Sequence, residues 1–220
     1  MSAAADDTLA PLPPVPDHAS ARLSVETIAR LTSYGDALAS DGVIRGLIGP
    51  REVPILWDRH LLNCAAMAEA VERDARIVDI GTGAGLPGLV LALVRDDIQV
   101  VLIETLQRRC DFLSEMVEKF ELQSRVTVVW GRAEEVPPQE ADIVTSRAVA
   151  ALKKLIPWCM PHVRIGGRLL AMKGQKAGEE LQAARKSLHK WSAAKHAELL
   201  TCGTGWIDPP VTLVSATRGK

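Results

Sequence analysis

The chain has 220 residues, of which 47% are hydrophobic, so it is long enough to bury the core of one ordinary globular domain. Its formal net charge of −1 excludes a uniformly basic nucleic-acid binder, and its composition excludes a chain that is disordered throughout. No apolar run reaches the length of a membrane span, and no basic segment followed by an apolar stretch stands at the N-terminus. We therefore expect a cytoplasmic globular protein without membrane contact.

The distribution of charges and cysteines bears on the type of substrate and on the cellular compartment. Residues 1–140 carry 13 Lys and Arg against 22 Asp and Glu, whereas residues 141–220 carry 13 against 5. A basic C-terminal part favours a polar, anionic substrate, although solvated charges on amphipathic helices would give the same counts. The four cysteines stand far apart and form no C-x-x-C pair, which is typical of a reducing compartment. We predict neither a disulfide framework nor a metal site.

Two segments precede the first expected strand. Residues 1–18 contain four prolines among few apolar residues, which predicts a disordered tail. Residues 19–72 carry apolar side chains at helical spacing, with breaks near Gly42 and Pro50, which predicts an N-terminal helical extension. Residues 73–220 alternate short apolar runs with helical patterns, and we expect them to form an α/β domain that packs with the extension as one unit.

A glycine-rich stretch, Asp79-Ile80-Gly81-Thr82-Gly83-Ala84-Gly85-Leu86-Pro87-Gly88, joins an expected strand to an expected helix at residues 89–94. This order opens the nucleotide-binding type of α/β sheet, because glycines let the backbone approach a ligand and a helix N-terminus attracts an anion. The motif Gly83-x-Gly85-x-x-Gly88 also satisfies the dinucleotide fingerprint, so a nicotinamide-dependent oxidoreductase is an alternative. With its leading acid, Asp79, the loop resembles motif I of the class I S-adenosylmethionine-dependent methyltransferases.

Two later strands are expected to end in charged residues beside this loop. The strand at residues 99–104 ends in Glu104, where folds of this type place a carboxylate that accepts hydrogen bonds from both ribose hydroxyls. The strand at residues 141–145 is followed by Ser146-Arg147-Ala148. Because ligands bind in the crevice at the carboxyl ends of parallel strands, Arg147 is our best candidate for a catalytic role, through positioning.

The remaining elements complete the sheet. A strand is expected at residues 126–130 and a helix at 152–163, after which Gly166-Gly167 turns the chain into a strand at 168–174. A basic helix at 179–195 is followed by two stretches, 197–201 and 211–216, that predict a closing hairpin. The pattern predicts a mostly parallel, Rossmann-like seven-stranded sheet with one antiparallel strand.

Four motifs occur along the chain in a distinctive order: Asp58-Arg59-His60-Leu61-Leu62-Asn63, the glycine stretch ending in Gly-Leu-Pro-Gly, Ser146-Arg147-Ala148 and Met172-Lys173-Gly174. Together they resemble the RsmG family, also called glucose-inhibited division protein B. That family consists of bacterial methyltransferases that act on N7 of a guanine in the 16S RNA of the small ribosomal subunit. The resemblance implies S-adenosylmethionine as cofactor and ribosomal RNA, in a ribosomal particle, as partner; we expect a monomer.

The resemblance also implies site residues. It places cofactor contacts at Gly81, Leu86, Ala133, Glu134 and Arg147; the resemblance to motif I adds Asp79 and Gly83, and the reading of the residues themselves adds Glu104. Candidates for the RNA-facing side of the crevice are Arg59, His60 and Lys173. For His60, a hydrogen-bonded structural histidine is an equally good interpretation.

The methyl transfer that the resemblance implies needs no catalytic base. N7 of guanine carries a free lone pair, so no proton has to leave before it attacks the sulfonium methyl group. The sequence shows no nucleophile–His–acid set, and no Asn-Pro-Pro-Tyr signature follows residues 141–145. Catalysis would rest on positioning the two reactants. The alternatives are a methyltransferase acting on a small molecule or a protein, and a non-catalytic RNA-binding module.

Overall fold

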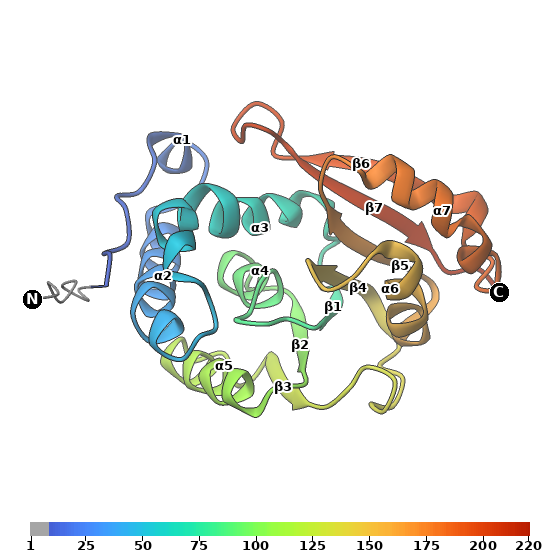
Figure 1. The fold of residues 1–220 in the computed structure, drawn as a ribbon, viewed down its shortest axis with the longest axis horizontal. Coiled ribbons are helices and arrows are strands. Elements are labelled where there is room, and N and C mark those ends of the chain that lie inside the picture. The colour runs from blue at the N-terminus through green and yellow to red at the C-terminus, as the bar shows by residue number, and fades with distance from the viewer. Residues whose placement is uncertain (1–8) are drawn as a thin grey trace, which may run out of the picture.

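The computed structural model describes residues 9–220 and shows a seven-stranded sheet with helices on both faces (Figure 1). The strand order is β3-β2-β1-β4-β5-β7-β6, and neighbouring strands are parallel except where β7 pairs with β5 and β6. The predicted fold is confirmed. The strands are β1 (Arg76–Ile80), β2 (Gln99–Glu104), β3 (Val126–Trp130), β4 (Ala141–Arg147), β5 (Val163–Lys173), β6 (Ala197–Cys202) and β7 (Val211–Thr217).

Successive residues of the buried strands pack into two separate apolar cores, one on each face of the sheet, because side chains alternate between the faces. In β1, Ile77 packs with the N-terminal helices and with α4 and α5, whereas Val78 packs with α6 and α7. The helices are α1 (Asp17–Ser20), α2 (Val25–Ala37), α3 (Asn63–Ala66), α4 (Gly88–Val94), α5 (Gln107–Lys119), α6 (Leu152–Cys159) and α7 (Ala177–His189). Short 3-10 and π-helical turns lie at Leu38–Gly42, Pro50–Ile55, Leu56–Leu62, Met67–Ala70, Met160–His162 and Ala194–His196.

The N-terminal helices belong to the core of the domain. Leu31 and Tyr34 of α2 and Trp57 of the π-helical turn are buried in the same cluster as the sheet residues. Of the tail predicted at residues 1–18, residues 1–8 lie outside the described part of the chain. Further along, the Pro13 carbonyl accepts a hydrogen bond from the Trp57 indole at 3.0 Å. The division of the chain at residues 18 and 72 stays a prediction.

The expected turn at Gly166-Gly167 is wrong. The helix ends earlier, at Cys159, and β5 begins at Val163 and continues through both glycines. The pairing of β5 with β4 shifts register between Ala141 and Ile143, as at a bulge. A side chain on Gly167 would lie 2.8 Å from the carbonyl oxygens of Ala141 and Asp142, so glycine permits this close approach within the strand.

Other element boundaries differ by a few residues. The strand predicted at 141–145 continues to Arg147, and the helix predicted to reach residue 195 ends at His189. Strand order reverses where β1 lies between β2 and β4, and this switch point is where ligands bind in open α/β sheets. Among residues 9–220, no helix is both long enough and apolar enough to cross a bilayer.

Candidate functional site

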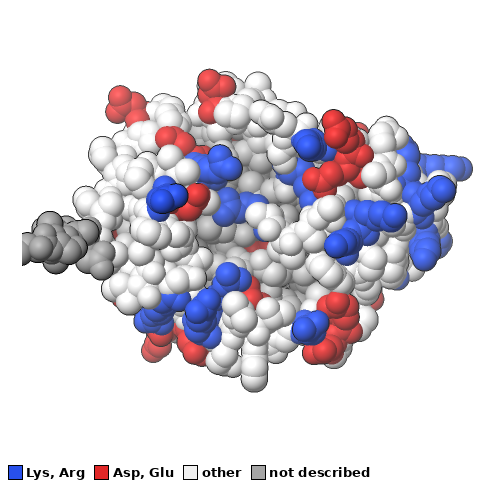
Figure 2. Space-filling view, in the orientation of Figure 1, with Lys and Arg blue, Asp and Glu red and all other residues white. Residues whose placement is uncertain are grey.

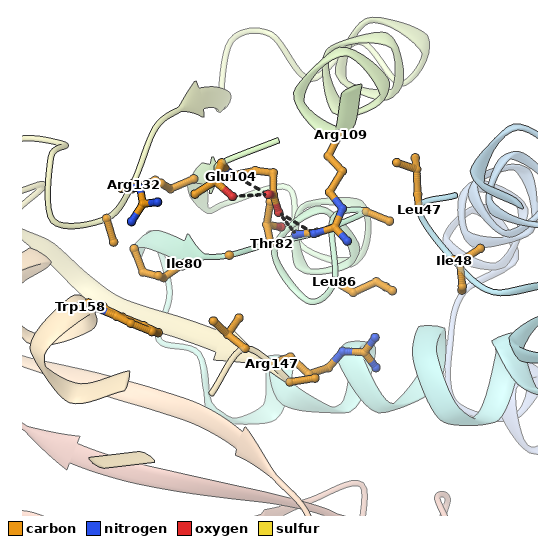
Figure 3. Close-up of a pocket in the computed structure, with 18 of the residues that line it drawn as sticks. Leu47, Ile48, Ile80, Thr82, Leu86, Glu104, Arg109, Arg132, Arg147 and Trp158 are labelled. Carbon is orange, nitrogen blue, oxygen red and sulfur yellow. Dashed lines mark hydrogen bonds and ion pairs between the residues drawn. The ribbon is translucent and has the colours of Figure 1, made fainter. Parts of the chain in front are cut away.

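A cavity of about 710 Å³ lies at the carboxyl ends of β1, β2 and β4. Seven of the eight residues predicted to bind cofactor line it: Gly81, Gly83, Leu86, Glu104, Ala133, Glu134 and Arg147. The N-terminal extension closes another side of the cavity with Leu47, Ile48, Glu52 and His60. The domain and its extension therefore form one site (Figure 3).

The glycines of the loop have two different structural roles. Gly83 has a positive φ of +63°, and a side chain there would meet no protein atom within 4 Å, so its backbone faces open space in the cavity. At Gly88, by contrast, a Cβ would lie 2.5 Å from Leu102 and 2.8 Å from Asp79. Gly83 leaves room for a ligand, and Gly88 lets α4 pack closely on the sheet.

Asp79 lies beneath the loop and does not line the cavity. Its side chain is fully buried, and Oδ2 accepts hydrogen bonds from the Thr82 hydroxyl at 2.6 Å and the Gly88 amide at 2.8 Å. Oδ1 has no partner within the described part of the chain. Burial raises the pKa of Asp79 to about 6, against the opposing effect of these two hydrogen bonds. Asp79 therefore shapes the loop, and its predicted contact with the cofactor stays a prediction.

Glu104 joins the loop to the end of β2. Its carboxylate is 3% exposed; Oε2 accepts from the Gly83 amide at 2.9 Å, and Oε1 accepts from the amides of Thr105 and Leu106. Arg109, on the first turn of α5, donates to Oε2 at 3.4 Å and also lines the cavity. The sequence analysis did not single out Arg109, although its place five residues after Glu104 was a usable signal.

The loop after β3 borders the cavity as expected. Gly131, Arg132, Ala133 and Glu134 line it, and the Ala133 carbonyl accepts a hydrogen bond from Nε2 of the buried His162 at 2.8 Å. Trp158 of α6 lines the same region and was interpreted from sequence only as part of a helix. Figure 3 shows Trp158 on the opposite side of the cavity from Arg109.

Arg147 is the last residue of β4, and its guanidinium is tied to the N-terminal extension. Nη2 donates to Nδ1 of His60 at 2.8 Å, and Nη1 donates to the Arg59 carbonyl at 3.3 Å. Nε2 of His60 in turn bonds Oε2 of Glu52 at 2.7 Å. Burial, followed by the charge of Arg147, lowers the pKa of His60, which favours the neutral ring.

The three residues predicted to face RNA lie in different environments. Arg59 is exposed, whereas His60 is 8% exposed with both ring nitrogens engaged. Lys173 is also largely enclosed: its ammonium donates to the Ala150 carbonyl at 2.7 Å and pairs with Glu180 at 2.9 Å. Of these three side chains, Arg59 is the one available at the surface.

Several basic side chains lie around the cavity. Figure 2 shows a hollow near the centre of the face, with Lys and Arg interspersed with Asp and Glu around it, and further Lys and Arg over α7. Exposed arginines adjoin the residues that line the cavity, namely Arg51, Arg59, Arg108 and Arg132. This surface suits an extended polyanion placed across the mouth of the cavity.

Comparison with known proteins identifies the family of the chain. A sequence model described as rRNA small subunit methyltransferase G, named GidB, matches residues 27–205. "Ribosomal RNA small subunit methyltransferase G" of Mycolicibacterium paratuberculosis is 48% identical over 218 residues, which cover 95% of this chain and 87% of that protein. The protein of the same name from Thermobifida fusca is 50% identical over 204 residues, covering 92% and 85%.

Solved structures share the fold at low identity. A SAM-dependent O-methyltransferase of Thermotoga maritima superposes with a TM-score of 0.54 at 18% identity, covering 72% of this chain and 66% of that one. TYW2 of M. jannaschii, solved in complex with AdoMet, superposes with a TM-score of 0.54 at 17% identity, covering 75% and 79%. The family model spans α2 through β6, and the relatives cover more than nine-tenths of the chain, which therefore belongs to the rRNA small subunit methyltransferase G (GidB) family of S-adenosylmethionine-dependent methyltransferases.

Proposed function

We propose that this enzyme transfers the methyl group of S-adenosylmethionine to N7 of a guanine in 16S ribosomal RNA. The relatives are named for methylation of small-subunit ribosomal RNA, which supports the substrate class. The choice of N7 is what the resemblance to the RsmG family implies, and the end of β4 supports it. There His60 already accepts a hydrogen bond from Arg147, and Ser146 already donates to the Ile80 carbonyl at 2.8 Å, so neither side chain is free to take a proton. A ring nitrogen with its own lone pair needs no such base.

The cavity fits the cofactor by its chemistry and its shape. Gly83 leaves open space beside the loop, and Glu104 presents a carboxylate at the strand end where ribose hydroxyls bind in folds of this type. We assign the adenine side to Ala133 and Glu134, and the methionine side to the Gly81–Gly83 backbone with Leu86. When bound, S-adenosylmethionine supplies an electrophilic methyl group on a positively charged sulfur.

The protein contributes to catalysis by aligning the cofactor and the RNA base. The loop backbone and Glu104 fix one reactant, while Arg147 lies at the end of β4, where the second reactant has to approach. Holding two reactants in line is worth roughly 7–11 kcal/mol of the barrier when the geometry is good. Arg147 acts here as a fixed cation toward the RNA and moves no proton, because a guanidinium stays charged.

The rim arginines are assigned to RNA phosphates. Arg59 is the candidate of our sequence reading that remains at the surface, and Arg132 lies at the edge of the cavity. We place His60 and Lys173 behind this surface, where they hold Arg147 and the segment that follows it. We further propose that the enzyme acts in the cytoplasm, as a monomer, on a ribosomal particle. Its four buried free thiols fit a reducing compartment.

The test is methyl transfer from labelled S-adenosylmethionine to small ribosomal subunits that lack the modification, with naked 16S RNA and total protein as parallel substrates. We expect label in one 16S RNA position and a higher rate on the particle than on naked RNA. Label in a protein or a small molecule, with none in 16S RNA, would overturn the RNA assignment and support the alternative methyltransferase.

A further inference from the structure

Three side chains from three separate elements form a continuous hydrogen-bonded chain on the wall of the cavity. Glu52 comes from the 3-10 turn Pro50–Ile55, His60 from the π-helical turn Leu56–Leu62, and Arg147 from the end of β4. The contacts measure 2.7 Å between Glu52 and His60, and 2.8 Å between His60 and Arg147. All three residues line the cavity.

The direction of each hydrogen bond follows from chemistry. A guanidinium has donors and no acceptor, so Nδ1 of His60 must carry the lone pair that faces Arg147. Nε2 then carries the hydrogen, and it donates to the Glu52 carboxylate. One neutral tautomer of His60 therefore satisfies both neighbours at once, and a protonated ring would lose the acceptor and place a second cation against Arg147.

The hydrogen bonds that link Glu52, His60 and Arg147 restrict the Arg147 side chain, which is otherwise flexible. Arginine has four side-chain torsions, and ordering such a side chain costs rotamer entropy. The His60 side chain is 10% exposed and that of Glu52 is 40% exposed, so the imidazole at the centre of the hydrogen-bonded chain is largely enclosed, whereas the Glu52 carboxylate reaches solvent. The second donor of Arg147, to the Arg59 carbonyl, fixes the guanidinium to the same helical turn.

We propose that Glu52 and His60 are positioning residues, which hold Arg147 in the orientation needed for methyl transfer. The proposal rests on the proposed function insofar as Arg147 faces the reactants. It assigns the N-terminal extension a direct part in the chemistry and makes the reaction sensitive to the protonation of one buried histidine.

The charged groups around His60 set the expected pH response. Glu52 faces it from the 3-10 turn, Arg59 from its own turn and Arg147 from β4. Both arginines lower the pKa of His60, and Glu52 raises it. Removing the charge of Glu52 must therefore lower that pKa further, and removing Arg147 must raise it.

The experiment measures kcat/KM for methylation of small subunits against pH for the wild-type enzyme, Glu52→Gln, Glu52→Ala and His60→Asn. In Glu52→Gln the amide oxygen still accepts from Nε2–H, so we expect kcat/KM at neutral pH to fall no more than about threefold, with the acid limb moved to lower pH. In Glu52→Ala the anchor is gone, and we expect a loss of about 10- to 100-fold, mainly in kcat. In His60→Asn, whose amide oxygen can take the place of Nδ1 but does not titrate, we expect the histidine part of the acid limb to disappear.

A matched control is Asp58→Asn. Asp58 lies on the same turn as His60 and pairs with His18 of α1 at 3.3 Å, but both side chains are exposed and neither contacts Arg147. We expect its pH profile to match that of the wild type. An acid limb that stays in place in both Glu52→Gln and His60→Asn would overturn the proposal.

A readout independent of activity separates this proposal from the assignment of the substrate. Nitrogen NMR of the labelled enzyme reports the tautomer and pKa of His60 in wild type, Glu52→Gln and Arg147→Ala. We expect hydrogen on Nε2, a lower pKa in Glu52→Gln and a higher one in Arg147→Ala. Hydrogen on Nδ1 of His60, or a His60 pKa that neither substitution moves, contradicts the proposed hydrogen-bonded chain, whichever substrate the enzyme methylates.

Discussion

The hydroxyl of Tyr34 donates a hydrogen bond to the carbonyl of Ala84, so that a side chain of α2 holds the glycine loop from outside the sheet. Tyr34 is fully buried, and burial raises the pKa of its phenol well above the ordinary value, so the group stays protonated and remains a donor. The two residues are 50 positions apart in sequence. The N-terminal extension is thus fixed to the loop at Ala84 as well as to β4 at Arg147.

Replacement of Tyr34 by Phe tests this contact. It leaves the ring in place and the Ala84 carbonyl without its partner, so we expect a loss of about 1–3 kcal/mol in the free energy of unfolding and weaker binding of S-adenosylmethionine. Chemical denaturation and titration calorimetry measure the two effects. Ser40→Ala, which removes an exposed hydroxyl bonded to the Asp36 carbonyl, is the control and should change stability by no more than about 0.5 kcal/mol. Equal cofactor affinity in Tyr34→Phe and wild type would show that the contact does not shape the loop.

Substitutions at two glycines of the loop should affect cofactor binding and protein stability to different extents. Gly83→Ala places a methyl group in the open cavity at a positive φ, so we expect impaired cofactor binding with a stability loss of about 1–2 kcal/mol. Gly88→Ala forces a methyl group against Leu102 and Asp79 and should cost more stability, about 1–3 kcal/mol or above. Thermal unfolding without ligand, followed by cofactor titration of each variant that folds, checks the order. If Gly88→Ala proves the more stable of the two, the assigned roles of these glycines are wrong.

The raised pKa of Asp79 should make the stability difference between wild type and Asp79→Asn depend on pH. Its pKa in the folded protein is about 6, above the value near 3.9 of an exposed aspartate, so the folded state binds more protons between these values. The stabilising effect of protonation is present below about pH 4 and is lost as pH rises through 6. Asp79→Asn keeps an oxygen acceptor without the charge, so its stability relative to wild type should increase between pH 4.5 and 7.5, by at most about 3 kcal/mol. Urea denaturation at both pH values measures the difference; a stability of Asp79→Asn that falls relative to wild type as pH rises contradicts the assignment.

Arg59 should contribute to RNA binding without affecting the cofactor. It is exposed beside the cavity, and each phosphate contact adds about 0.9 to the salt dependence of binding to a duplex, somewhat less for single strands. We expect Arg59→Ala to weaken binding to small subunits and to reduce the slope of log K against log salt by about 1, with unchanged affinity for S-adenosylmethionine. The control is Arg45→Ala, since Arg45 is paired with both carboxylate oxygens of Glu115 at 2.8 Å and does not line the cavity. The same slope in Arg59→Ala and wild type would remove Arg59 from the interface.

Local patterns in the sequence were enough to predict the sheet and the glycine loop that lines the cavity. The strand at 99–104 and its terminal Glu104 were placed correctly, because a buried parallel strand is a short apolar run and its acid marks the end. The pair Gly166-Gly167 was interpreted as a turn because a glycine pair usually breaks a strand. Here it lies within β5, where the β4 backbone approaches too closely for a side chain at Gly167, and no local pattern reveals that approach.

The residues that sequence reasoning missed come from distant segments. Tyr34 and Glu52 belong to the extension, whose amphipathic pattern indicated helices but not which polar side chains would meet the glycine loop or β4. Likewise, Lys173 was a candidate for RNA contact, and its pairing with Glu180 of α7 depends on how the chain turns between β5 and that helix. Such pairings depend on tertiary packing, which a single sequence does not show.

The most direct test of the account identifies the methylated nucleoside. Small subunits lacking the modification are incubated with the enzyme and labelled S-adenosylmethionine, and the digested RNA is analysed by mass spectrometry, with Arg147→Ala in parallel. We expect label in 7-methylguanosine at one 16S RNA position, and a much lower rate with the variant. Label in a nucleoside methylated on an exocyclic amine or a hydroxyl would contradict the base-free mechanism, and an unchanged rate in Arg147→Ala would contradict the role given to that residue.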